Sequence, residues 1–84
     1  MSQPFYEAAN KVLTMYALRQ ERDSALAPAH SDSEIFWACA ILEGLSLAAA
    51  YAGSKEAVAI RNAVDSWIAN EKIPELFILE EAEQ

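Results

Sequence analysis

The middle of the chain is an almost unbroken run of apolar residues. From residue 35 to residue 52, only Glu43, Gly44 and Ser46 are not hydrophobic. A surface helix with one buried face carries polar residues on its opposite face. This run therefore predicts a central helix, over residues 32–52, that other elements must cover on most of its sides.

Both ends of this helix carry recognisable signals. Ser31, followed three residues later by Glu34, matches the capping box, in which two side chains accept hydrogen bonds from backbone N–H groups at the start of a helix. Gly53 suits the left-handed conformation that commonly closes a helix. Between these ends, we expect the narrow polar strip of the helix to contain Glu43 and Ser46.

Amphipathic patterns on either side predict two further helices, over residues 3–23 and 55–70. In each of them, apolar residues recur at the three- and four-residue spacing of one helical face. The two faces comprise Phe5, Ala9, Val12, Leu13 and Tyr16 in the first helix, and Ala57, Ile60, Val64, Trp67 and Ile68 in the other. Arg19 and Arg22 are expected in the last turn of the first helix, where cations favour the carbonyl end. Ser54 can cap the start of the other.

The C-terminal residues favour a fourth, short helix over residues 74–82. Pro74 fits the first helical position, where its missing N–H is not needed. A short extended run over residues 76–79 is the alternative. In either case an acidic tail, residues 80–84, ends the chain.

Together these patterns predict an all-α fold, a small bundle of three main helices plus the short C-terminal helix. With 84 residues, the chain has the length of one domain, residues 1–84. The expected core consists of Phe5, Val12, Leu13, Tyr16, Ile35, Ala38, Ile41, Leu42, Leu45, Ala49, Ile60, Val64, Trp67 and Ile68.

The composition favours completion of this bundle by dimerisation. Hydrophobic residues make up 54% of the chain, yet a domain this short buries only about 60% of the surface of its unfolded form. On the central helix, small residues recur every four positions, a spacing that lets another helix approach closely. This small-residue rib consists of Ala40, Gly44, Ala48 and Ala52. In a soluble domain such a rib usually marks a tight helix crossing within the chain, and its second interpretation is a homodimer interface.

The formal charge of −7 lies entirely after residue 31. Residues 32–84 contain ten acids and three bases, whereas acids and bases cancel in residues 1–31. An acidic surface disfavours nucleic acid and anionic lipid, and it suits a basic protein surface. We therefore expect a basic protein partner and no direct nucleic-acid binding.

Residue types that carry catalysis are sparse. The two glycines, Gly44 and Gly53, form no phosphate-binding loop, and one histidine with one cysteine gives no metal-ligand spacing. Cys39 lies midway along the central helix, away from the helix N-terminus that would lower its pKa. His30 is expected to be an exposed loop residue. We expect no enzyme activity, no cofactor and no metal.

The central helix leaves two alternatives open. Glu43 either faces solvent or is buried and paired with Arg61, Arg19 or Lys11. The helix is also long enough to span a bilayer, but a carboxylate at its middle makes a membrane span the less favoured interpretation. The first ten residues lack the basic and apolar regions of a secretory signal. We therefore expect a cytoplasmic protein.

The sequence favours a non-catalytic protein-binding module, such as a regulator, inhibitor, chaperone or adaptor that docks on a basic partner surface. One alternative is a phage-type inhibitor whose carboxylates imitate nucleic-acid phosphates, and another is a small subunit that forms a ligand or catalytic site only in an oligomer. The expected binding surface mixes acidic and apolar residues. It consists of Asp65, Glu71, Glu75, Leu76, Phe77, Glu80, Glu81 and Glu83. In a second interpretation, Phe77 only covers the core.

Overall fold

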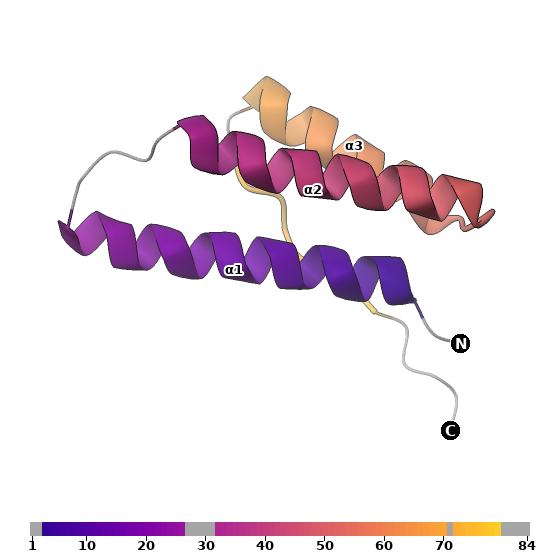
Figure 1. Cartoon of the computed structure of the whole chain (residues 1–84), viewed down its shortest axis with the longest axis horizontal. Coiled ribbons are helices and arrows are strands. Elements are labelled where there is room, and N and C mark those ends of the chain that lie inside the picture. Colours follow the sequence, from indigo (N-terminus) through magenta and orange to yellow (C-terminus); the bar gives the residue numbers. More distant parts are fainter. Residues whose placement is uncertain (1–2, 27–31, 71, 80–84) are drawn as a thin grey trace.

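The described part of the chain forms three helices, followed by a non-helical segment over residues 72–79. A computed structural model describes residues 3–26, 32–70 and 72–79. The helices are α1 (Pro4–Leu26), α2 (Asp32–Tyr51) and α3 (Glu56–Asn70). They run alternately in opposite directions, α3 lies beside α2, and residues 72–79 pass back across α1 (Figure 1). The all-α prediction is confirmed, since the described residues form helices and no strand.

Two predicted helix ends need correction. α1 continues to Leu26, beyond residue 23, so Arg19 does not lie in its last turn. The guanidinium of Arg19 instead lies over the ring of Trp37 on α2, 5.3 Å from the ring centroid, in a cation–π contact. The predicted helix over residues 74–82 is wrong for residues 74–79, which have no regular structure. Residues 80–82 and Ser31 of the predicted capping box lie outside the described residues.

Gly53 ends α2 as the sequence predicts. Its φ of 72° is the left-handed conformation. The N–H of Ser54 donates to the carbonyl of Ala49 (2.8 Å), and the N–H of Gly53 donates to that of Ala50 (3.0 Å). These two bonds are those of a Schellman motif, which satisfies carbonyls at the helix end. The chain therefore turns within a few residues, and α3 begins beside the end of α2.

The core lies where the three helices meet. Its buried members are Ala9, Leu13, Tyr16, Ala38, Cys39, Leu42, Ile60, Val64 and Trp67, and Phe5, Val12, Ile35 and Leu45 pack against them partly buried. The rings of Tyr16 and Trp67 meet edge to face, with centroids 4.9 Å apart. Two predicted core residues are exposed, Ile41 by 38% and Ile68 by 63%. Ile68 follows Trp67 by about 100° around the helix, which turns it away from the core.

A buried carboxylate joins the starts of α1 and α3. Glu56 is only 8% exposed. Its Oε2 accepts the backbone N–H of Tyr6 in the first turn of α1 (2.8 Å), and its Oε1 accepts the hydroxyl of Ser54 (2.7 Å). The Ser54 Oγ accepts the N–H of Glu56 (3.1 Å), which confirms Ser54 as the cap of α3. Because both helix N-termini carry partial positive charge, one carboxylate serves both.

A buried hydroxyl joins α2 to α3. Ser46 was expected on the polar strip of the central helix, but it is buried, and its hydroxyl donates to the carbonyl of Ala57 (2.9 Å). This is a correction to the sequence prediction. The bond satisfies a polar group that would otherwise be costly to bury.

The first prediction tests the core. Replacing the fully buried Leu42 with alanine should reduce the free energy of unfolding by about 2–5 kcal/mol, because a cavity remains. Leu18→Ala is the matched control, since Leu18 is an exposed leucine on α1 and should cost about 0.5 kcal/mol or less. Urea unfolding followed by circular dichroism measures both, and equal costs would contradict this core.

The second prediction tests the Glu56 bridge. Glu56→Ala should cost about 1–3 kcal/mol, because the N–H of Tyr6 loses its partner. Glu56→Gln keeps an acceptor and should cost less. The exposed Glu75 provides the control, since Glu75→Ala should change stability by no more than about 0.5 kcal/mol. If Glu56→Ala behaves like this control in urea unfolding, the bridge does not stabilise the fold.

Candidate functional site

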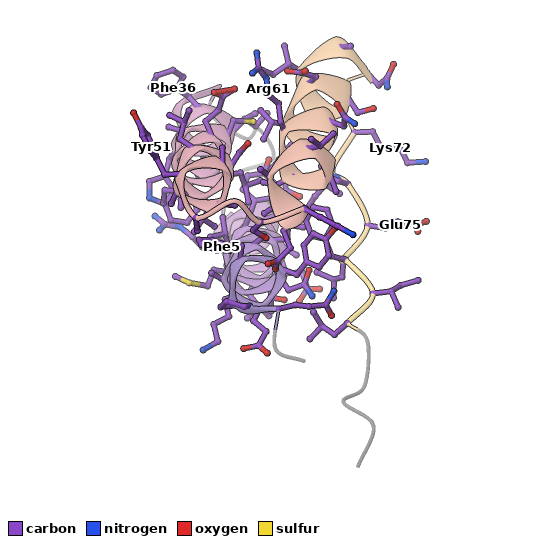
Figure 2. All side chains as sticks on the ribbon, turned by 90° about the vertical axis from the view of Figure 1, so that its right-hand side faces the viewer. Phe5, Phe36, Tyr51, Arg61, Lys72 and Glu75 are labelled. Carbon is purple, nitrogen blue, oxygen red and sulfur yellow. The ribbon has the colours of Figure 1, made fainter. Side chains whose placement is uncertain are left out.

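The outer side of α2 is apolar and uncovered. Phe36, Leu47 and Tyr51 are 74%, 60% and 93% exposed. Figure 2 shows Phe36 and Tyr51 on the same side of α2, pointing away from the other two helices. At 100° per residue, these three side chains fall within about 60° of one another. We call the exposed surface formed by Phe36, Ala40, Ile41, Gly44, Leu47, Ala48 and Tyr51 the outer face of α2.

The small-residue rib belongs to this exposed surface. Ala40, Gly44, Ala48 and Ala52 are all exposed. A Cβ built on Gly44 would meet no atom within 4 Å. The rib therefore does not mark a tight crossing between described helices of this chain, and that alternative from the sequence is wrong. Its place among larger apolar side chains leaves a shallow surface that a second helix could approach.

Glu43 faces solvent at the edge of the outer face. It is exposed, which decides between the two alternatives that the sequence left open. It is also the single charged residue between residues 36 and 52. The outer face therefore carries little of the net charge of the chain.

The exposed area is large for so small a protein. Aromatic side chains each present about 150–250 Å², so Phe36 and Tyr51 at their exposed fractions contribute roughly 250–400 Å². A partner in a typical stable interface contributes about 800 Å². With Leu47 and Ile41 added, the outer face has the scale of an interaction surface rather than of scattered exposed residues.

Four residues of the predicted acidic surface lie in the described part of the chain, namely Asp65, Glu75, Leu76 and Phe77. Asp65, Glu75 and Leu76 are exposed as expected, and Figure 2 shows Glu75 pointing away from the helices. Glu71, Glu80, Glu81 and Glu83 lie outside the described residues. Phe77 was expected as the aromatic anchor for a partner, but it packs against the core of its own chain. The second interpretation of Phe77, as a cover for the core, is therefore the one supported.

Asn10 and Tyr6 hold Phe77 against α1. The Phe77 N–H donates to Oδ1 of Asn10 (2.7 Å), and Nδ2 of Asn10 donates to the Phe77 carbonyl (2.9 Å). The Tyr6 and Phe77 rings stack with centroids 4.9 Å apart and planes 5° from parallel. We call Tyr6 and Asn10 the Phe77 site. This site was not predicted from the sequence, in which its one signal is Asn10, a polar residue and weak helix former in the interior of α1.

The titratable side chains in the core favour their neutral forms. Burial raises the pKa of the Cys39 thiol, and the negative charge of Glu43 raises it further. Burial also raises the pKa of Tyr16, whose hydroxyl accepts a hydrogen bond from the Gln20 amide. A neutral buried thiol is a poor nucleophile. His30, the other candidate for such chemistry, lies outside the described residues.

Neither a metal site nor a pocket in the described residues points to a particular ligand. Among the described residues, no three His, Cys, Asp or Glu side chains gather as a metal site. An open groove of about 440 Å³ lies between α3 and the C-terminal residues, and Asn62, Ser66, Asn70, Lys72 and Glu75 are among its lining residues. This mixture of amides, one base and one acid favours no particular class of ligand.

The membrane question is decided by neither length nor composition. Residues Glu34–Tyr51 form a helix long and apolar enough to cross a membrane, and 28% of this stretch is buried in the structure. A core helix of a soluble protein can be equally long and apolar, but it is mostly buried. α2 is therefore covered less by the rest of the described chain than a typical core helix is.

Comparison with known proteins does not assign the chain to a family. No family model, curated protein or solved structure matches it.

Proposed function

We propose that this chain is a non-catalytic protein-binding module that works as a homodimer, paired through the outer face of α2. The observation that carries this proposal is the exposure of Phe36, Leu47 and Tyr51 on one side of a helix that has a single charge between residues 36 and 52. Burying such a face against another apolar surface is favourable at about 25 cal/mol per Å².

A second copy of the chain suits this face, because the face contains both a small residue that lets two helices approach and large side chains that can pack around the contact. Gly44 lies near its middle, where its lack of a side chain lets two helix backbones come close. Phe36 and Tyr51 lie toward its two ends, where they can pack around the contact. A two-fold pair uses the same surface on both copies, so one face must supply both the small and the large residues.

The acidic surface outside this face supports binding to a basic protein. Asp65 is exposed on α3, and Glu75 is exposed on the C-terminal segment, residues 72–79. Figure 2 shows Glu75 on the opposite side of the molecule from Phe36 and Tyr51. The net charge of −7 would draw a basic partner by long-range attraction. In this proposal the apolar face makes the dimer and the carboxylates meet the partner.

The third prediction tests the dimer at Gly44. Because nothing lies within 4 Å of a Cβ at this position, Gly44→Ala should stabilise a single chain by about 1 kcal/mol through helix propensity. Gly44→Phe should leave the helix intact but raise the dimer dissociation constant at least about tenfold. Analytical ultracentrifugation with circular dichroism separates the loss of pairing from the loss of folding.

The control for Gly44→Phe is another small-to-large change at an exposed helical site. Ala69→Phe on α3 should leave the dissociation constant unchanged. A wild-type chain that stays at the monomer mass of 9.2 kDa at high micromolar concentration would refute the homodimer.

The fourth prediction uses salt to separate the two kinds of association. Two copies each carry −7, so raising NaCl from about 0.05 to about 0.5 M should strengthen dimerisation by screening their repulsion. Docking on a basic protein should weaken over the same range. Dimerisation that weakens steeply with salt would show that charge pairs, rather than the apolar face, hold the copies together.

A further inference from the structure

Phe77 makes the hydrogen bonds that attach the C-terminal segment to α1. Among the described residues, the two bonds between Phe77 and the Asn10 side chain are the only hydrogen bonds that residues 72–79 make. The residues on either side of Phe77 project outward, with Leu76 exposed by 55% and Ile78 by 88%. The hydrogen-bonded contact is therefore confined to Phe77, and the Phe77 and Ile73 side chains add apolar packing against the core.

The Phe77 site recognises general features of a peptide rather than features peculiar to this chain. The Asn10 amide pairs with both the N–H and the carbonyl of one residue, which is how one strand recognises another, and every residue except proline offers those groups. Tyr6 adds a stacking surface that selects an aromatic side chain. A segment that enters this site needs a non-helical backbone and one aromatic residue.

Asn10 is the residue that makes this site specific. An asparagine in a helix interior is a weaker helix former than alanine or leucine. Here both polar atoms of its side chain are used on the C-terminal segment. Without a segment in the site, the exposed amide would offer an unused donor and acceptor beside an aromatic ring, which are the elements of a peptide-binding site.

We propose that the Phe77 site is a docking site for a non-helical segment of a partner protein that carries an aromatic residue, and that Phe77 is an internal occupant which the partner displaces. This surface is separate from the outer face of α2, since Figure 2 shows Phe36 and Tyr51 on one side of the molecule and Lys72 and Glu75 on the other. The two proposals can therefore fail independently.

The test empties the site in the full chain and offers a peptide in its place. The variant is Phe77→Ala, and the probe is a synthetic peptide with the sequence of residues 72–81, KIPELFILEE. The peptide should bind this variant at least about tenfold more tightly than it binds the wild-type chain, because the internal competitor is gone. Binding is measured by NMR titration, following the amide signals of residues 6 and 10.

Two further changes show whether the bound peptide uses the proposed contacts. Replacing the peptide phenylalanine by alanine should weaken binding about tenfold or more, whereas replacing the isoleucine after it, which matches the exposed Ile78, should change binding less than about twofold. Adding Asn10→Ala to the Phe77→Ala chain should abolish binding. Equal binding of the three peptides, or binding unaffected by Asn10→Ala, would overturn the proposal.

A second arm covers a Phe77→Ala chain that fails to fold. The wild-type chain is then titrated with millimolar unlabelled peptide, which should displace the internal segment and move the signals of residues 76, 77 and 78 of the chain, because these residues leave the Phe77 site. If those signals stay in place, or if a folded Phe77→Ala chain binds no peptide, Phe77 is a fixed part of the core and the proposal is wrong.

Discussion

α2 has only two neighbouring helices, so part of its circumference stays uncovered. This geometric limit determines where the exposed apolar surface of α2 lies. α1 and α3 pack on two sides of α2, and the third side is left to solvent (Figure 2). Most surface helices place polar residues there, whereas this one places Phe36, Leu47 and Tyr51. Four of the exposed large apolar side chains of the described residues thus lie on this one helix, namely Phe36, Ile41, Leu47 and Tyr51.

Helix ends impose the second constraint. The first turn of a helix presents N–H groups that lack helical partners, and a partly buried turn needs acceptors for them. Glu56 supplies one to α1 from the first turn of α3, so the charge that caps one helix also fixes the position of the other. Ser46 ties α2 to α3 in a comparable way. These two buried polar contacts define how the helices are arranged, while the apolar contacts supply most of the stability.

The sequence predicted what depends on neighbouring residues and missed what depends on distant ones. Periodicity located the three helices and Gly53 ended α2, because caps and apolar stripes are local signals. The partner of Glu56 is 50 residues away and that of Asn10 is 67 residues away, so no local pattern could indicate either contact. The same distance explains why the helix predicted over residues 74–82 is wrong for residues 74–79. Pro74 favours a helix locally, but the Asn10 side chain forms hydrogen bonds with the backbone N–H and carbonyl of Phe77.

The sequence also did not show which apolar residues at the edge of a helical face are buried. Trp67 and Ile68 are both apolar neighbours on α3, but the packing of one helix against its neighbours buries the first and exposes the second. On α2 the rib and Glu43 could be placed on a face but not assigned to the inside or the outside. Only the positions of α1 and α3 decide that, and they leave the rib exposed.

The outer face of α2 and the Phe77 site lie on different sides of the molecule, so a dimer formed through the first would leave the second accessible in both copies. A pair formed through the outer face of α2 would bury a surface with little charge. It would leave residues 72–79 of both copies uncovered, since Figure 2 shows Lys72 and Glu75 on the opposite side of the molecule from Phe36 and Tyr51. Such a pair carries twice the acidic charge and two Phe77 sites. A partner with two matching segments would then bind the second as an intramolecular event, with a gain in avidity that needs no new contact. Dimerisation would in this way strengthen binding at sites that lie far from the dimer interface.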